Sequence, residues 1–299
     1  MAGYLPSVFT AADAITSGLS RNQLRGARYP QVFWGVHTVS EPEDASVRAL
    51  AALRVAGPMA LLGSLTVLRF VGVWLPKQFE QDNRVHITMP PGVCGSANSS
   101  IIVTRSKVVF EPVEFWDVLG LMGIHPAQAW FQAARYLNLE DLVVAADSLM
   151  RRQNTIALRS EMEFVISSFP GRRGVKLARR ALKLAHEGVD SPMETRLRLA
   201  LVAAGLRCPE VNLPLRPRPD GPQYFLDMAY PHVKLAVEYD GAGHAATPTQ
   251  IQRDRTRRRE IEDAGWRIIT ATIADSPDWA RVIASVRAAL RAKSGNSSI

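Results

Sequence analysis

The chain has 299 residues, of which 47% are hydrophobic, and this length and composition predict two or three globular domains and exclude a disordered chain. Its formal net charge of +8 is compatible with binding to nucleic acid, although many soluble proteins are mildly basic without that role. Two distant cysteines, Cys94 and Cys208, the absence of a basic and then apolar leader, and the lack of a bilayer-spanning apolar run predict a cytoplasmic protein.

Residues 1–40 predict two short helices joined by a tight turn. Thr10 is a candidate cap for the first helix. Ser20 is a candidate cap for the second, and Gln23, three residues later, completes a capping-box pattern that satisfies the open amides of a helix start. We expect this second helix to continue until Pro30, which cannot extend it.

The second helix is followed by QVFWGVHTV, which predicts a short strand pair that turns around Gly35. Two short helices and a small hairpin form the layout of a winged helix-turn-helix. In that interpretation the helix presents three basic side chains to DNA: Arg21, Arg25 and Arg28. The alternative is a plain helical hairpin at a domain edge, with the arginines on a solvated face.

Residues 41–150 predict a mixed α/β domain. The helical patterns cover residues 44–55, 59–71, 126–136 and 139–150, and the strand patterns cover residues 84–89 and 100–104. No catalytic constellation is evident in this segment. His86 lies in an alternating strand pattern, where a lone histidine is more often structural, and it is assigned no role.

The stretch FTAADAITSGLSRNQLRGARYPQVFWGVHTV, followed by GPMALLGSLTVLRFVGVWLP, resembles the N-terminal half of AbiEi-family antitoxins. Those proteins pair a winged helix-turn-helix with an α/β domain. The likeness is one of layout and covers roughly half of the chain. It implies DNA binding at a promoter or at invading DNA.

Residues 151–190 are basic and predict two helices, because Pro170 and Gly171 interrupt the pattern. Two interpretations fit this segment. It is either a connector that also contacts phosphates or a solvated helical linker.

From Ser191 onward the patterns predict a helix, three strands, a helix, a strand and a final helix. Ser191 is the expected cap of the first helix, with Pro192 at its first position and Glu194 at its third. Capping alone suffices to explain a glutamate at that third position. Gly265 is the expected end of the second helix.

Acidic residues fall on two adjacent strands of this C-terminal segment. Alternation places Asp227 on one face of its strand, with Phe225 and Ala229, and places Glu238 and Asp240 together on one face of the next strand. A hairpin between these strands brings Asp227 beside Glu238. Clustered carboxylates suit Mg²⁺ or Mn²⁺, which prefer oxygen ligands. The alternative is that the acids simply meet solvent, since the Asp-Gly pair at residues 240–241 is also a turn signal.

The helix that follows adds a stripe at three- and four-residue spacing, formed by Ile251, Asp254, Arg258 and Ile261. We expect this stripe to face the sheet and the flanking arginines to contact phosphates: Arg253, Arg255, Arg257 and Arg259. The alternative is a basic solvated helix. His244, four residues after Asp240, is a candidate for orienting water beside a metal site, although a lone loop histidine is usually structural.

The ordered motifs METRL, FLDMAYP, VEYDGAGH and QRDRTRRREIEDAGWRII resemble the PD-(D/E)xK nuclease superfamily. The nearest likeness is to a bacterial domain family related to very-short-patch repair endonucleases, over residues 191–291. It implies a restriction-endonuclease-like fold, with a four-stranded mixed sheet flanked by helices, and metal-dependent phosphodiester hydrolysis.

The resemblance also implies roles for individual residues. Asp227 and Glu238 match the metal-binding acids. Asp240 stands where the superfamily pattern usually has lysine, although the related family often has Asp-Gly at this position. Glu194, His244 and Asp254 match the first-helix glutamate, the histidine and the helix acid of the related family. The missing lysine leaves the water-activating group open.

The sequence therefore predicts four segments: a winged helix (1–40), an α/β domain (41–150), a basic connector (151–190) and a nuclease-like domain (191–299). The predicted function is a double-stranded-DNA-binding, Mg²⁺-dependent endonuclease, in toxin–antitoxin or phage-defence biology. Arg253, Arg257 and Arg258 join the N-terminal arginines as predicted nucleic-acid contacts. The alternative is a non-catalytic DNA-binding regulator or antitoxin with an inactive nuclease fold. A nucleotidyltransferase and a P-loop enzyme are disfavoured because their motifs are absent.

Overall fold

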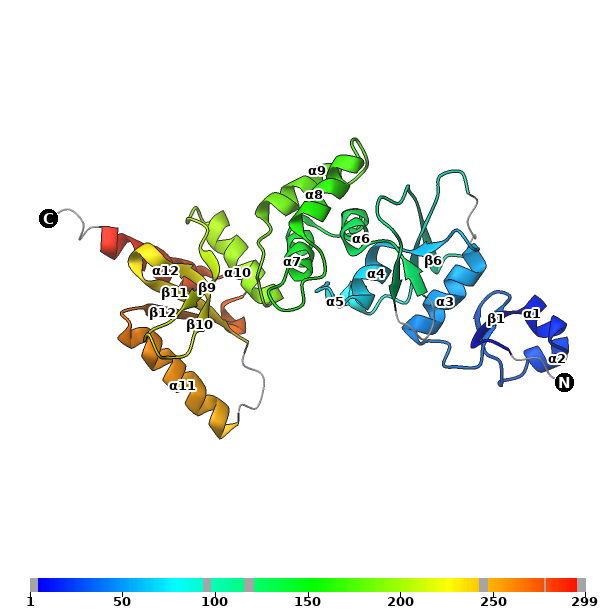
Figure 1. Ribbon diagram of the computed structural model, residues 1–299, viewed down its shortest axis with the longest axis horizontal. Coiled ribbons are helices and arrows are strands. Elements are labelled where there is room, and N and C mark those ends of the chain that lie inside the picture. The colour runs from blue at the N-terminus through cyan, green and yellow to red at the C-terminus, as the bar shows by residue number, and fades with distance from the viewer. Residues whose placement is uncertain (1–4, 94–97, 116–120, 242–246, 277, 295–299) are drawn as a thin grey trace. The chain divides into compact units, whose positions relative to one another are not determined.

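The computed structural model describes residues 5–93, 98–115, 121–241, 247–276 and 278–294. The chain divides into two compact units, the first with residues 1–145 and 156–180 and the second with residues 146–155 and 181–299. Three sheets with surrounding helices make it a multidomain α/β protein, as the sequence predicts (Figure 1). The residues of the predicted connector are divided between the two units.

The N-terminal part of the first unit contains a three-stranded antiparallel sheet and two short helices. Its elements are β1 (Val8–Thr10), α1 (Ala11–Thr16), α2 (Arg21–Leu24), β2 (Gln31–Phe33) and β3 (Val36–Thr38), with strand order β1-β3-β2. Both predicted caps are confirmed: the Asp13 amide donates to the Thr10 hydroxyl at 3.1 Å, and the Gln23 amide donates to the Ser20 hydroxyl at 3.3 Å. The predicted hairpin is also confirmed, with Gly35 at a φ of +75°.

The second helix is shorter than predicted, because α2 ends at Leu24. The amide of Gly26 donates to the carbonyl of Gln23 and closes a turn there. Arg25 and Arg28 therefore lie beyond the helix instead of along it. Arg28 packs over the ring of Tyr29, with 5.6 Å between the guanidinium carbon and the ring centroid.

The larger sheet of the first unit has five strands in the order β6-β5-β4-β8-β7. The strands are β4 (Leu61–Leu62), β5 (Val85–Met89), β6 (Ile101–Arg105), β7 (Val113–Phe115) and β8 (Leu121–Gly123), and the accompanying helices are α3 (Ala45–Ala56), α4 (Ser64–Phe70), α5 (Lys77–Glu80), α6 (Pro126–Ala133), α8 (Arg159–Ser168) and α9 (Val175–Leu184). Helix α7 (Leu139–Leu149) and helix α9 each have residues in both units. The predicted helix over residues 59–71 is wrong at its beginning, because β4 there pairs with both β5 and β8.

His86 is buried on β5, and among the described residues neither ring nitrogen has a hydrogen-bond partner. Its ring meets the edge of Tyr136 with 4.9 Å between centroids. Burial, reinforced by the nearby charge of Arg69, lowers the pKa of His86 from 6.5 to about 4. The folded chain therefore holds this histidine neutral at pH values where the unfolded chain protonates it.

This difference predicts acid sensitivity of the first unit. Between pH 6.5 and about 4 the unfolded state binds a proton that the folded state refuses, so stability falls as the pH falls through this window. We expect His86→Phe to remove about 2 kcal/mol of this pH dependence in urea unfolding at pH 5 and pH 7.5. The exposed His232, changed to Phe, should leave it intact. An unchanged pH dependence in His86→Phe would contradict the assignment.

The second unit confirms the predicted order of elements. These are α10 (Pro192–Ala203), β9 (Glu210–Leu215), β10 (Tyr224–Tyr230), β11 (Leu235–Asp240), α11 (Pro248–Asp263), β12 (Arg267–Thr272) and α12 (Ala280–Ser294). The sheet has the order β12-β11-β10-β9, with β11 and β12 parallel and the other neighbours antiparallel. Two short 3-10 turns, Pro231–Val233 and Ile273–Asp275, follow β10 and β12.

Helices cover both faces of this sheet (Figure 1). One face packs against α10 and α12 through a core that includes Leu197, Met228 and Val282. The other face packs against α11 through a smaller core that includes Ala236 and Ile261. In the parts of the chain that the structure describes, no helix combines the length and apolar character needed to cross a membrane.

A buried ion pair joins residues 146–155 to the rest of the second unit. Arg198 on α10 donates to the Asp147 carboxylate at 2.6 Å, and the two side chains are 3% and 0% exposed. Asp147 also accepts from the Thr195 hydroxyl at 2.9 Å and from the His186 amide at 2.7 Å. Arg198 donates in addition to the Leu184 carbonyl at 2.7 Å. Each charge is thus held by several partners.

Candidate functional site

The candidate site lies on β10 and β11 of the second unit. Met228 pairs with Val237 across these strands, so one step further along the register places Asp227 opposite Glu238. The Asp227 carboxylate accepts the Tyr239 amide hydrogen at 3.0 Å. The predicted neighbourhood of Asp227 and Glu238 is therefore present.

Strand β10 does not alternate regularly at Asp227. Leu226 packs with Ala229 in the core beneath α11, whereas Met228 packs in the core on the opposite face. The β9 register skips the position opposite Asp227, which is Asn212, and Asn212 has a left-handed φ of +48°. Because of this irregularity, charged side chains on both α10 and α11 influence the pKa of Asp227. The predicted alternation, with Phe225, Asp227 and Ala229 on one face, is therefore not regular.

Negative charge is concentrated around Asp227. Burial is the largest cause that raises the pKa of Asp227 from 3.8 to about 7, and the carboxylates of Glu194 and Glu238 raise it further. The Tyr239 amide and Arg257 act in the opposite direction. An acid held in this way costs stability when ionised, and a bound cation would relieve that cost.

Glu194 is the third acid of this group and is only 8% exposed. Its amide donates to the Ser191 hydroxyl at 3.2 Å, as predicted for a helix cap. Its own carboxylate accepts the Asp190 amide hydrogen at 3.2 Å. Burial raises the pKa of Glu194 despite these bonds. Capping thus explains its position, while its charge acts on Asp227.

Glu238 is neutralised from α11 by Arg257. The guanidinium donates to both carboxylate oxygens, at 2.9 and 2.6 Å, and also to the Phe225 carbonyl at 2.8 Å. The side chains of Arg257 and Glu238 are 29% and 15% exposed. Arg257 therefore points toward the sheet, whereas the sequence pattern placed it on a flank for phosphate contact.

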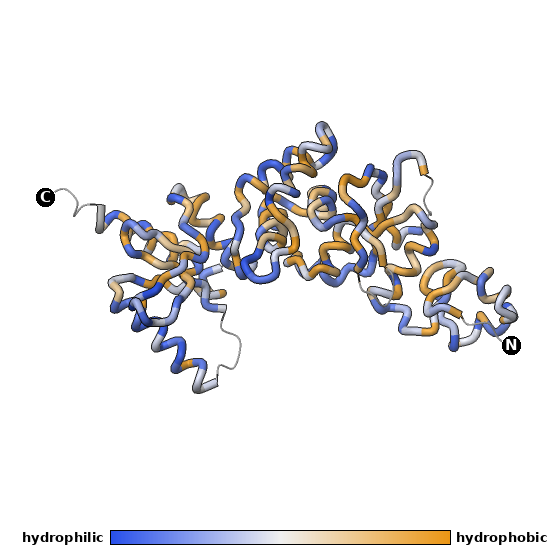
Figure 2. Tube along the Cα trace, in the orientation of Figure 1, coloured by the Kyte–Doolittle hydropathy of each residue, from blue (hydrophilic) through white to orange (hydrophobic). Residues whose placement is uncertain are grey.

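The predicted inward stripe of α11 is confirmed at Ile261 and in part at Arg258, whose exposed guanidinium donates to the Thr270 hydroxyl of β12 at 3.4 Å, and it is wrong at Ile251 and Asp254. Ile251 is 42% exposed, and Asp254 and Arg258 are exposed too. The inward residues are Arg257, Glu260 and Ile261, with Glu260 accepting from the Tyr224 hydroxyl at 2.8 Å. Figure 2 shows that α11 is hydrophilic along most of its length, so its few apolar positions define the face poorly.

The remaining predicted site residues that the structure describes lie at exposed positions. Asp240 ends β11 as an exposed residue. Arg253 is exposed, and Arg258 donates to Glu262 one helical turn away at 3.0 Å. Residue His244 lies outside the described residues. At the other end of the chain, Arg21, Arg25 and Arg28 are all exposed.

Arg152 is a neighbour of the site that sequence reasoning missed. Its guanidinium lies 4.3 Å from the ring centroid of Phe225 and pairs with Asp190 at 2.6 Å. Its charge also lowers the pKa of Glu194, against the larger effect of burial. A basic connector residue thus lies beside the acids because residues 146–155 belong to the second unit.

The chemistry of Asp227, Glu194 and Glu238 fits a hard divalent cation, because all three offer carboxylate oxygens around a crowded negative charge. As arranged, however, no group of three His, Cys, Asp or Glu residues within the described ranges is placed to hold a metal ion. Glu238 is instead directed to Arg257. The three acids therefore suit a divalent cation by their oxygen donors and their negative charge. A cation would have to compete with Arg257 for Glu238.

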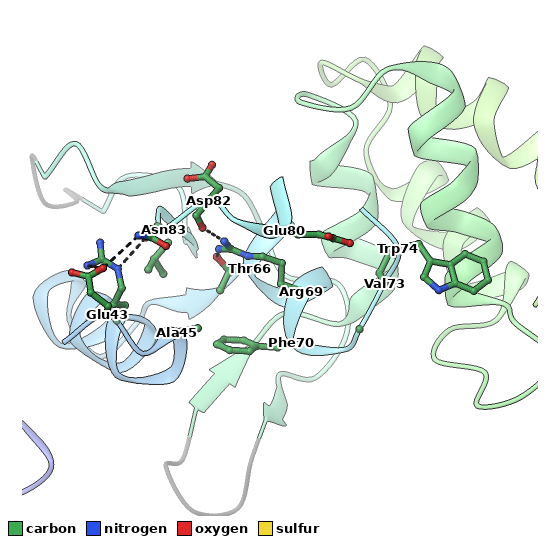
Figure 3. A pocket seen from close by; sticks show the side chains of 13 residues that line it. Glu43, Ala45, Thr66, Arg69, Phe70, Val73, Trp74, Glu80, Asp82 and Asn83 are labelled. Atoms are coloured by element: carbon green, nitrogen blue, oxygen red, sulfur yellow. Dashed lines mark hydrogen bonds and ion pairs between the residues drawn. The ribbon is translucent and has the colours of Figure 1, made fainter. Parts of the chain in front are cut away.

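The first unit contains a cavity of about 410 Å³ beside α4 that the sequence did not predict (Figure 3). Arg69 lies in its wall and donates to the Thr66 hydroxyl at 3.1 Å, to the Arg84 carbonyl at 2.8 Å and to the Asp82 carbonyl. These bonds tie the loop before β5 to α4. Because its donors go to two backbone carbonyls and a side-chain hydroxyl of the protein itself, we assign Arg69 a structural role.

The chain is similar to two uncharacterized proteins of Mycobacterium tuberculosis, from strains H37Rv and CDC 1551 / Oshkosh. Each is 28% identical over 257 residues, which cover 85% of this chain and 89% of the relative. No family model matches the chain, and no solved structure matches it.

Proposed function

We propose that the second unit is a restriction-endonuclease-like domain that hydrolyses phosphodiester bonds with Mg²⁺ or Mn²⁺. The observation that carries the proposal is the half-buried Asp227, flanked by Glu194 and Glu238 on a four-stranded mixed sheet. An acid with a strongly raised pKa is characteristic of functional sites. The sheet, with helices on both faces, is compatible with the fold that the sequence motifs suggest.

The residues of the chain supply charge, orientation and proton exchange. Asp227, with a pKa of about 7, is poised between its two protonation states near neutral pH. Arg257 fixes the orientation of Glu238 through two hydrogen bonds. Asp227 and Glu238, with Asp240 as a third candidate, would hold the cation, which when bound activates water and stabilises charge on the phosphodiester.

Exposed arginines would provide the nucleic-acid contacts. In the first unit the two capped helices and the hairpin are compatible with a winged helix-turn-helix, and Arg21, Arg25 and Arg28 are exposed there. On α11, Arg253 is exposed, and Arg258 is exposed beside Glu262. Arg257 is already committed to Glu238. We propose double-stranded DNA as the substrate, in toxin–antitoxin or phage-defence biology.

A second candidate function is a non-catalytic DNA-binding regulator. The observation that favours this alternative is the ion pair between Glu238 and Arg257, because it engages the carboxylate of a predicted metal ligand. Asp240, at the position where the superfamily pattern usually has lysine, also favours this alternative. In this alternative the second unit keeps a nuclease-like fold without cleaving DNA.

A nicking assay separates the two functions. Supercoiled plasmid with Mg²⁺ or Mn²⁺ should be nicked by the purified chain, and Asp227→Ala or Glu238→Ala should lower the rate by at least about 100-fold. Asp220→Ala, which removes an exposed acid of the same unit, is the matched control and should keep full activity. Nicking that persists in an Asp227→Ala, Glu238→Ala double variant would overturn the proposed site. Inactivity of the native chain on DNA and RNA would favour the regulator.

A further inference from the structure

A small pocket in the first unit has a polar, buried floor. It lies between the end of β6, the end of α6 and the segment that joins α8 to α9, and its volume is about 130 Å³. Thr104 and Gln132 contribute to the floor and are 6% and 4% exposed. We refer to it as the Gln132 pocket.

Two hydrogen-bonding atoms of this floor have no partner among the described residues. They are the Thr104 hydroxyl oxygen and the Gln132 side-chain nitrogen. The other amide atom of Gln132 accepts from the Thr88 hydroxyl at 3.1 Å, so the amide is held in place. Buried polar groups in folded proteins are nearly always hydrogen-bonded, and two orphan atoms on residues that line one pocket point to a ligand with acceptor atoms.

The rim of the pocket is strongly basic. Four exposed arginines line it: Arg105, Arg135, Arg172 and Arg173. Arg105 donates to the Val93 carbonyl at 3.2 Å, and the other three have no side-chain partner recorded among the described residues. No acidic side chain is among the described residues that line the pocket. The charge therefore suits an anion with more than one negative charge.

One wall of the pocket is formed by two aromatic side chains. Phe131 and Phe169 stack with 5.2 Å between ring centroids and an interplanar angle of 15°. Lys107 lies over the Phe169 ring at 5.4 Å. The stacked rings pack α6 against the segment that joins α8 to α9. Arg172 and Arg173 therefore extend from a segment that is held by this packing.

We propose that the Gln132 pocket binds a phosphate monoester group. Its volume is below the roughly 300 Å³ of pockets that enclose a drug-sized ligand, so it accommodates one compact group and leaves the remainder of the molecule outside. A phosphate monoester carries nearly two charges and three terminal acceptor oxygens, which match the arginine rim and the two neutral donors. A phosphodiester extends in two directions and fits a closed floor poorly. The group belongs either to a small phosphorylated compound or to the 5′ end of a nucleic-acid strand.

Titration calorimetry on the full chain at physiological salt tests this site. The probes are inorganic phosphate, a nucleoside 5′-monophosphate, and one oligonucleotide with either a 5′-phosphate or a 5′-hydroxyl end. Binding of the first two identifies a small phosphorylated ligand. A preference for the 5′-phosphate oligonucleotide alone identifies a strand end. Failure of all phosphate probes, or equal binding of the two oligonucleotides without binding of the small ones, would overturn the proposal.

Charge reversal on the rim supplies the specificity control. We expect an Arg172→Glu, Arg173→Glu double variant to bind the phosphate probe at least about tenfold more weakly, because charge-assisted hydrogen bonds are lost. An Arg179→Glu, Arg180→Glu double variant alters the charge equally on exposed positions of α9 and should retain affinity. Equal losses in both would show a general charge effect and contradict a built pocket.

Thr104→Val gives a second, independent readout. Valine has a similar shape but removes the orphan hydroxyl, so the unliganded chain should melt at the same temperature or higher. The increase in melting temperature on adding phosphate should shrink at the same time. A variant that melts normally and keeps the full phosphate response would exclude Thr104 from the site.

Discussion

Replacing Arg198 by methionine is expected to lower the free energy of unfolding of the second unit by about 3–5 kcal/mol. The change leaves the Asp147 carboxylate at 0% exposure without its counter-charge. Burial already raises the pKa of Asp147, and Arg198 is the largest opposing influence. The Thr195 hydroxyl and the His186 amide remain but carry no full charge. Urea unfolding followed by tryptophan fluorescence measures the loss.

Two further variants make this expectation specific. Arg291→Met removes an exposed arginine of α12 and should change stability by less than about 0.5 kcal/mol. An Asp147→Leu, Arg198→Met double variant removes both charges, and we expect it to be more stable than Arg198→Met alone. If the double variant is as unstable as the single one, lost packing and not an unpaired charge is the cause.

Asp227→Asn is expected to stabilise the second unit by about 4 kcal/mol at pH 8 and by less than about 1 kcal/mol at pH 4. The pKa of this carboxyl is raised by burial and by Glu194 and Glu238 to about 7 in the folded chain, against 3.8 ordinarily. Between these values the folded state retains a proton that the unfolded state has released. Stability therefore falls as the pH rises through this window, and asparagine, which does not titrate, avoids the loss.

The same variant tests the proposed cation site without an activity assay. Millimolar Mg²⁺ should raise the melting temperature of the native chain at pH 8, and Asp227→Asn should reduce this increase. Asp220→Asn serves as the control at an exposed acid. A higher stability with an unchanged Mg²⁺ response would mean that Asp227 is a strained acid with no part in cation binding.

Local sequence signals predicted most of the elements, because they act within a few residues. The caps at Thr10, Ser20 and Ser191 follow from side-chain bonds to amides three residues away. The strands around Asp227 and Glu238 follow from apolar runs separated by a turn. Strand β4 was not predicted, because its two residues lie inside a helix-like pattern. They form a strand only by pairing with β5 and β8.

The sequence determined that acids on two adjacent strands would meet, because the hairpin register of β10 and β11 is set by their apolar positions. Only the tertiary structure decided what surrounds them. The left-handed Asn212 lies opposite the point where the alternation of β10 is interrupted. Charged residues of both α10 and α11 influence the pKa of Asp227 there. The packing of a nearly all-polar helix selects Arg257 as the partner of Glu238. Such contacts depend on how separate helices and strands pack against each other. Short-range sequence patterns do not specify that packing.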